Sequence, residues 1–141
     1  MRYLITGGAG FIGSHLADYL LSHETDAQVT LLDNLSTGRY QNIAHLEIHP
    51  RVRLLIGSVL DERLLEDIIR DSDCVFHLAS AVGVKLILER PVQSIETIVK
   101  GTNGVLQFAS RYRKPVLITS TSEVYGKSTA IPFREDGDQV M

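Results

Sequence analysis

The sequence is poor in cysteine: Cys74 is the only one among 141 residues. A disulfide within the chain is therefore excluded, and because Cys74 begins an apolar run we predict that it is a small buried core residue. Long hydrophobic runs are also absent, since no segment approaches the roughly 20 apolar residues of a membrane helix, and Met1 leads into the first apolar segment without a secretory leader. We expect a cytoplasmic protein with no membrane partner.

Positive charge is not in excess either. The formal net charge is -3 at pH 7 and no basic cluster occurs, so the chain lacks the electrostatic footprint of a nucleic-acid-binding protein. Hydrophobic residues at 44% and charged residues at 22% are ordinary globular values, and the length suits one domain with a substantial core. We expect neither nucleic acid nor a metal ion as a partner.

Glycine is concentrated in one stretch, TGGAGFIG at residues 6–13, directly after the apolar residues 3–5. Spaced glycines between a strand and a helix let the backbone approach a ligand closely, and they place a pyrophosphate on the positive N-terminus of the helix. The spacing satisfies both G-x-G-x-x-G and G-x-x-G-x-x-G. A second apolar segment ends in Asp33, twenty positions past Gly13, where a carboxylate accepts hydrogen bonds from an adenosine ribose. The pattern predicts a bound dinucleotide.

Apolar segments alternate with helical patterns along the chain. This rhythm indicates parallel βαβ units, and a glycine turn after the first strand favours a doubly wound α/β fold, a Rossmann-like sheet with strand order 3-2-1-4-5. We expect residues 1–126 to form this domain and residues 127–141 to be an irregular tail, so that the sheet is incomplete at its C-terminal side. The predicted strands are 3–5, 29–32, 52–56, 74–79 and 115–118, and the predicted helices are 11–23, 61–70 and 91–112, with a short helix within 43–48.

Two features of the predicted helices bear on packing. The first helix carries five large apolar residues at helical spacing, and the long helix is interrupted by Gly101 and Gly104, which we interpret as positions of close helix packing. The five apolar residues are Phe11, Ile12, Leu16, Tyr19 and Leu20.

Ligands of such sheets bind outside the carboxyl ends of the strands. We therefore predict that the cofactor is bound by residues that follow the first four strands. They are Gly7, Gly10, Phe11, Ile12, Gly13, Asp33, Asn34, Ser36, Thr37, Gly38, Ser58, Val59, Leu78, Ala79 and Ser80.

Four motifs in order carry a family resemblance: TGGAGFIGSH at 6–15, DNLSTG at 33–38, HLA at 77–79 and TSTSEVYG at 119–126. Together they resemble the extended short-chain dehydrogenase/reductase family, and more narrowly its NAD-dependent nucleotide-sugar epimerases, dehydratases and decarboxylases. The resemblance implies a bound NAD that removes a hydride from a sugar hydroxyl, a UDP- or dTDP-sugar as substrate, and a homodimer in the full-length enzyme.

The resemblance also implies catalytic roles. Thr121 takes the place of the hydroxyl that orients the sugar, and Glu123 resembles a carboxylate that some members use as acid or base. The family's base is a tyrosine with a lysine four residues later, which lowers the pKa of the phenol. This chain therefore resembles the first part of a longer enzyme, and we expect it to be inactive alone. The residues four places after its five tyrosines are Gly7, His23, Ala44, Val116 and Thr129.

Three departures from the family pattern limit the assignment. Ser58 stands where an acidic residue would contact the adenine, and Ile98 stands where the long helix would carry asparagine. Ser122, in place of aspartate before Glu123, argues against a dehydratase and leaves a decarboxylase or an epimerase. One alternative is a non-catalytic dinucleotide-binding or redox-sensing module that never had the tyrosine and lysine. Another is a Rossmann-like binder of a different nucleotide, against which Asp33 argues.

Overall fold

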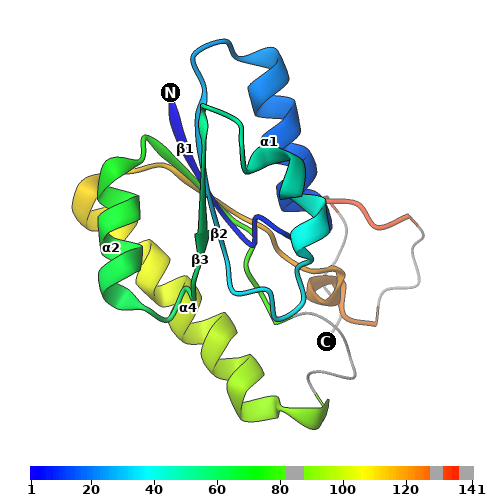
Figure 1. Cartoon of the computed structure of the whole chain (residues 1–141). Coiled ribbons are helices and arrows are strands. Elements are labelled where there is room, and N and C mark those ends of the chain that lie inside the picture. Colours follow the sequence, from blue (N-terminus) through cyan, green and yellow to red (C-terminus); the bar gives the residue numbers. More distant parts are fainter. Residues whose placement is uncertain (82–87, 128–131, 137–141) are drawn as a thin grey trace.

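The computed structural model describes residues 1–81, 88–127 and 132–136. Its five parallel strands form one sheet in the order β3-β2-β1-β4-β5, which confirms the predicted fold class (Figure 1). The strands are β1 (Arg2–Thr6), β2 (Gln28–Asp33), β3 (Val52–Ile56), β4 (Cys74–His77) and β5 (Val116–Ile118). The helices are α1 (Phe11–His23), α2 (Glu62–Asp71) and α4 (Pro91–Tyr112), and short 3-10 turns occur at η1 (Tyr40–Asn42), η2 (Ala44–Leu46) and η3 (Ser122–Tyr125).

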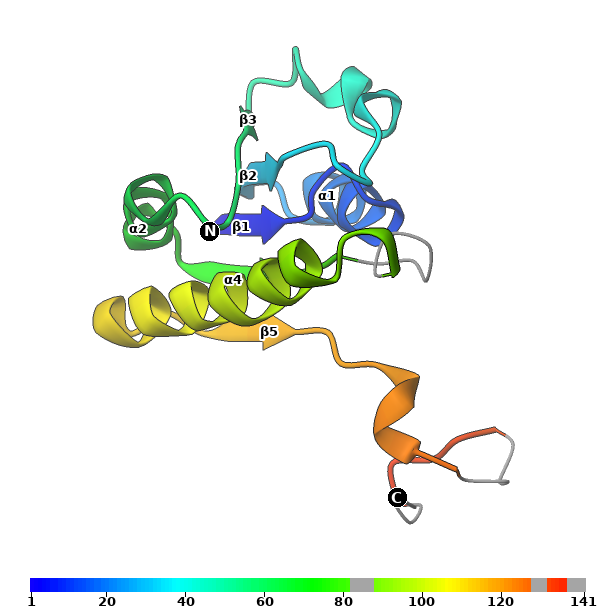
Figure 2. The same cartoon turned by 90° about the horizontal axis from the view of Figure 1, so that it is seen from below.

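Alternate residues of the central strands enter two separate cores. On one face Tyr3 and Ile5 of β1 lie with α1 and η2, and on the other face Leu4 lies with α2 and α4. Because both faces of β1 and β2 are covered, the sequences of these two strands are nearly continuous in apolar character. Figure 2 shows the sheet from below, with α2 and α4 on the near side.

The face of α1 that packs on the sheet contains only part of the predicted apolar pattern: Leu20 is buried and Leu16 packs against the same core. The other three large residues face outward. Phe11, Ile12 and Tyr19 are 76%, 62% and 58% exposed. At the start of the helix, Gly13 lets α1 approach the glycine turn closely. The buried residues of α1 are Gly13, Ser14, Ala17, Leu20 and Leu21.

Two other sequence predictions are corrected. Cys74 is half-buried at the edge of the first core and not a fully buried core residue, since its strand lies beside β5 where no helix of the described part covers that face. The strand β4 ends at His77, two residues earlier than predicted, because the N–H of Ala79 turns to the side chain of Thr6. The 3-10 turn η3 was not predicted.

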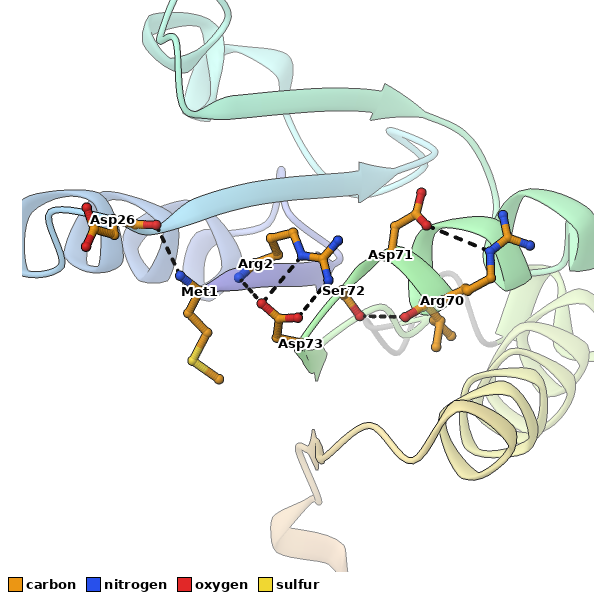
Figure 3. A network of polar contacts seen from close by, with 8 residues as sticks. Met1, Arg2, Asp26, Arg70, Asp71, Ser72 and Asp73 are labelled. Atoms are coloured by element: carbon orange, nitrogen blue, oxygen red, sulfur yellow. Dashed lines mark hydrogen bonds and ion pairs between the residues drawn. The ribbon is translucent and has the colours of Figure 1, made fainter.

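The amino edge of the sheet is held by charged contacts (Figure 3). The Asp73 carboxylate accepts from the backbone N–H of Arg2 at 2.8 Å and from its guanidinium at 2.9 Å, which ties the start of β4 to the start of β1. These bonds lower the pKa of Asp73 to about 2. The N-terminal amine donates to the carbonyl of Asp26 at 3.1 Å. This edge lies opposite the glycine turn.

Among the described residues, no helix is both long enough and apolar enough to span a bilayer.

Candidate functional site

The glycines after β1 have different environments. Gly7 has φ +72°, and a side chain there would meet the backbone nitrogen of Ala79 at 2.8 Å. A side chain at Gly13 would fall on the carbonyl oxygen of Gly7 and lie 2.9 Å from Cα of Gly8. Among the described residues, a side chain at Gly10 would meet only that same carbonyl oxygen, at 3.1 Å. Gly7 and Gly13 therefore permit the turn itself, whereas Gly10 borders open space that a ligand can enter.

The helix α1 begins with unsatisfied donors in front of this space. Its N-cap is Gly10, which has no side chain to accept from the first turn. In the part of the chain that the structure describes, the N–H groups of Phe11, Ile12 and Gly13 have no protein acceptor. By contrast, the Asp61 carboxylate caps α2 by accepting from Leu64 N–H at 3.1 Å. An uncapped helix N-terminus beside a glycine turn fits the charge and size of a pyrophosphate.

The carboxylate of Asp33 is fixed at the end of β2, next to the same turn. One oxygen accepts from the N–H of Ala9 at 2.9 Å, and the other accepts from the N–H of Leu35 at 2.8 Å. A side chain at Gly38 would lie 2.8 Å from this carboxylate, so the following loop needs glycine there. Each carboxylate oxygen keeps a further lone pair. Asp33 can therefore accept from a ribose hydroxyl without losing its present bonds.

The loop after Asp33 is held against the glycine turn by Ala9. The carbonyl of Ala9 accepts from Arg39 N–H at 3.1 Å and from the side-chain amide of Asn42 at 2.8 Å. The side chain of Asn34 accepts from Ser36 N–H at 3.0 Å and shapes the loop locally. The sequence prediction did not include Asn42, which lies in a weakly patterned segment. The predicted residues Asn34, Ser36 and Thr37 of this loop are exposed.

The loop after β4 approaches the glycine turn on its other side. Leu78 N–H donates to the carbonyl of Thr6 at 3.1 Å, and Ala79 N–H donates to the hydroxyl of Thr6 at 3.2 Å. His77 is buried behind this contact, and burial lowers the pKa of its imidazole below the usual value. Ser80, which follows, is exposed. The predicted cofactor residues of this loop thus lie beside Gly7, while the buried Thr6 and His77 were not predicted.

The two predicted residues after β3 have unequal access. Ser58 is half-buried, and its hydroxyl accepts from Leu60 N–H at 3.1 Å within its own turn. Val59 is buried in the second core, where Gly101 of α4 packs on it so closely that an added side chain would lie 2.7 Å from the valine methyl. Only the backbone of Val59 is therefore available to a ligand. The interpretation of Gly101 as a packing glycine is confirmed.

The predicted catalytic residues follow β5, and the structure does not bring them together with the glycine turn. The hydroxyl of Thr121 accepts from Glu123 N–H at 3.3 Å and begins η3. Both side chains are exposed, and this segment extends away from the sheet (Figure 2). Farther along, Tyr125 stacks on Phe133 at 4.8 Å between ring centroids. The described tail residues, 127 and 132–136, contain no helix or strand, and the rest of the predicted tail lies outside the described residues.

A hollow of about 520 Å³ lies elsewhere, at the amino edge beside Arg2, Thr30, Arg53 and Asp71. It includes none of the residues of the glycine turn. The candidate site is instead an open edge of backbone donors at the carboxyl ends of β1, β2 and β4. Within the described ranges no group of three histidine, cysteine or acidic side chains is placed to hold a metal.

The fold and this edge define a Rossmann-type dinucleotide-binding domain. A family model described as GDP-mannose 4,6 dehydratase matches residues 4–139. The chain belongs to this family, within the NAD-dependent epimerase/dehydratase group of extended short-chain dehydrogenases/reductases, and the predicted resemblance is confirmed.

Its relatives include two decarboxylases. The chain is 43% identical over 139 residues to a UDP-N-acetyl-alpha-D-glucosaminuronate decarboxylase of Bacillus cytotoxicus, and 40% identical over 135 residues to UDP-glucuronic acid decarboxylase 1 of Arabidopsis thaliana. These matches cover 99% and 96% of the chain but only 42% and 29% of the relatives. The chain thus spans less than half the length of these curated relatives.

Solved structures are similar in fold as well. The dTDP-glucose 4,6-dehydratase of Streptomyces venezuelae, solved with NAD bound, has a TM-score of 0.88 at 35% identity. The match covers 99% of this chain and 45% of the dehydratase chain. A UDP-N-acetylglucosamine 4-epimerase of Methanobrevibacter ruminantium has a TM-score of 0.85 at 30% identity, with 99% and 44% covered.

Proposed function

We propose that this chain binds NAD and is the cofactor-binding part of a nucleotide-sugar enzyme. The observation that carries the proposal is the uncapped N-terminus of α1, where the N–H groups of Phe11, Ile12 and Gly13 face the open side of Gly10. Two anionic phosphate groups suit these donors. Asp33 would accept from the adenosine ribose at the end of the neighbouring strand.

The redox chemistry of the site would come from the cofactor: when bound, NAD would accept a hydride from the carbon that carries a sugar hydroxyl, and the hydroxyl proton would pass to a base. The chain's own residues position the two reactants. The Thr121 hydroxyl accepts from a backbone N–H and keeps its proton, so it can donate to an oxygen of a UDP- or dTDP-sugar. Glu123 supplies a carboxylate for proton transfer. The decarboxylase relatives and Ser122 favour a decarboxylase, with an epimerase as the second possibility.

No tyrosine in these 141 residues is followed four positions later by a lysine. The chain therefore lacks the pair that would accept the proton of the sugar hydroxyl. A missing general base costs roughly 100- to 10,000-fold in rate. We therefore expect the chain alone, mixed with NAD and a UDP- or dTDP-sugar, to produce no NADH and no altered sugar. Turnover by the purified chain would contradict this part of the proposal. A non-catalytic dinucleotide-binding module remains the alternative if the chain binds NAD but no nucleotide sugar.

Titration calorimetry of the 141-residue chain with NAD tests the binding directly. We expect saturable binding at one NAD per chain and a higher melting temperature in its presence. A folded chain that binds no NAD would contradict the proposal.

A homodimer and a cytoplasmic location also belong to the proposal. Val92, Ile95 and Val99 of α4 are 70%, 61% and 60% exposed, which supports association through this helix. Sedimentation of the purified chain, with a Val99→Lys variant as the comparison, tests the dimer: we expect the unsubstituted chain to sediment as a dimer and the variant as a monomer. Equal sedimentation of the two would contradict a role for this face.

A further inference from the structure

A buried polar cluster links β1, β4 and α4 immediately behind the glycine turn. Thr6 and His77 are paired residues of the two parallel strands, and their side chains lie on the same face, with the Thr6 hydroxyl 2.7 Å from Nδ1 of His77. On the other side of the imidazole, Nε2 lies 3.1 Å from the hydroxyl of Thr102 in α4. Thr6 is fully buried and His77 is 3% exposed. Figure 2 shows α4 crossing the sheet beside β4 and β5.

One arrangement of protons gives every donor of the cluster an acceptor, and it uses the Nε2-protonated tautomer of His77. The Ala79 N–H can only donate, so the Thr6 hydroxyl accepts there, at 3.2 Å. The hydroxyl then gives its own proton to Nδ1 of His77, which makes Nδ1 an acceptor. The imidazole is neutral and carries its proton on Nε2, from which it donates to Thr102. Among the described residues, no buried side-chain nitrogen or oxygen lacks a hydrogen-bond partner.

This chain of hydrogen bonds connects the glycine turn with the loop after β4. The ladder between β1 and β4 ends with the bond from Leu78 N–H to the carbonyl of Thr6, and the Thr6 hydroxyl extends the pairing by one residue, to Ala79. The fit there is tight, because an added side chain at Gly7 would lie 2.8 Å from the Ala79 nitrogen. A small rotation of Thr6 would therefore move the β4 loop relative to the glycine turn.

We infer that His77 is a positioning residue for the dinucleotide site: it orients the Thr6 hydroxyl from its anchor on Thr102, and so holds the loop after β4 at the correct distance from the glycine turn. The inference rests on the proposed function, because its consequence is NAD affinity. His77 has no route to the ligand itself, since its side chain is buried behind the turn. Its effect is exerted through Thr6 and Ala79.

Paired variants of the two threonines test this role. Thr6→Val and Thr102→Val remove a hydroxyl while keeping the shape, whereas Thr6→Ser and Thr102→Ser keep the hydroxyl. We expect each valine variant to bind NAD roughly fivefold to tenfold more weakly, the effect of one lost hydrogen bond, and each serine variant to bind within about twofold of the unsubstituted chain. Nitrogen-15 spectra of the imidazole are expected to show the Nε2-protonated form of His77.

Tyr3→Phe is the matched control, because it removes the hydroxyl that donates to Glu24 at 2.7 Å on the opposite face of the same strand. We expect it to lower the melting temperature and leave the Kd for NAD unchanged. Valine variants that bind NAD as tightly as the unsubstituted chain, or a Tyr3→Phe variant that weakens binding equally, would overturn the inference alone. If Thr6→Val does not fold, Thr102→Val decides the inference, because Thr102 is only half-buried and its substitution is better tolerated. Absence of NAD binding by the unsubstituted chain would overturn the proposed function, and this inference with it.

Discussion

The different environments of Gly10 and Gly13 predict opposite effects of substitution. Gly10 has φ -71° and ψ 169°, a conformation open to any residue, and in the described part of the chain an added side chain meets only one oxygen, at 3.1 Å. We expect Gly10→Val to change the free energy of unfolding by less than about 1 kcal/mol. The valine would occupy the space in front of the free N–H groups of α1. Each hydrogen bond from such a donor to a charged oxygen contributes about 1.5–3 kcal/mol, so losing two weakens NAD binding by about 100-fold or more.

Gly13→Ala is the counterpart inside the fold. Its methyl would press on the backbone of Gly7 and Gly8, neither of which is a flexible side chain, so α1 must shift. Overpacking of this kind costs about 1–3 kcal/mol and lowers the melting temperature by roughly 2–10 °C. Thermal unfolding and calorimetry of both variants measure the two effects. A Gly10→Val variant that is folded and binds NAD normally would refute the assignment of Gly10 to the ligand side, and an equally stable Gly13→Ala variant would refute the packing argument.

Four further outcomes are expected. NAD binds more tightly than NADP, because the Asp33 carboxylate and a 2'-phosphate about 4 Å apart repel by roughly 4 kcal/mol at an effective dielectric of 20; calorimetry giving equal or tighter NADP binding would refute it. Asp61→Ala removes the acceptor for Leu64 N–H and lowers the free energy of unfolding by about 1 kcal/mol, without an effect on NAD affinity, as urea titration and calorimetry will show. Burial lowers the pKa of His77 below 6.5, so the contribution of His77 to stability is complete above pH 6.5 and is lost as the pH falls through the folded pKa. His77→Gln should therefore make the free energy of unfolding less dependent on pH in this range. An unchanged pH dependence in the variant would contradict this prediction. Leu117 lies on the edge strand β5 and is 49% exposed, so Leu117→Lys should reduce aggregation measured by light scattering. Unchanged scattering would mean that the chain does not aggregate through this edge.

Most of the fold could be predicted because apolar segments and helical patterns alternate without ambiguity. The strand order follows from the position of the glycine turn after the first strand and from the handedness of βαβ crossovers, both of which are local information. The packed face of α1 was predicted only in part. Leu16 and Leu20 pack on the sheet as expected, but Phe11 and Tyr19 face outward. In the first turn the close approach to the glycine turn leaves room only for Gly13 on the inner side. Side-chain size, and not only hydrophobicity, decides which face is buried.

The candidate site divides in the same way. Gly7, Gly13 and Asp33 could be found because their spacing along the chain reflects one turn and one neighbouring strand. Thr6 and His77 lie 71 positions apart, and only the register of two parallel strands brings them together. Asn42 reaches Ala9 from a segment without regular pattern. Polar contacts between distant segments leave no periodic trace in a sequence.

The most direct measurement of the central claim is an NMR titration of the nitrogen-15-labelled chain with NAD. The account predicts that the backbone amides of Phe11, Ile12 and Gly13 shift first and most strongly, together with those of Leu35 and Ala79 beside the turn. Residues at the opposite edge, around the hollow lined by Thr30 and Arg53, should not shift. Saturable shifts confined to that opposite edge, or no shifts in a folded chain, would contradict the assignment of the dinucleotide site to the glycine turn.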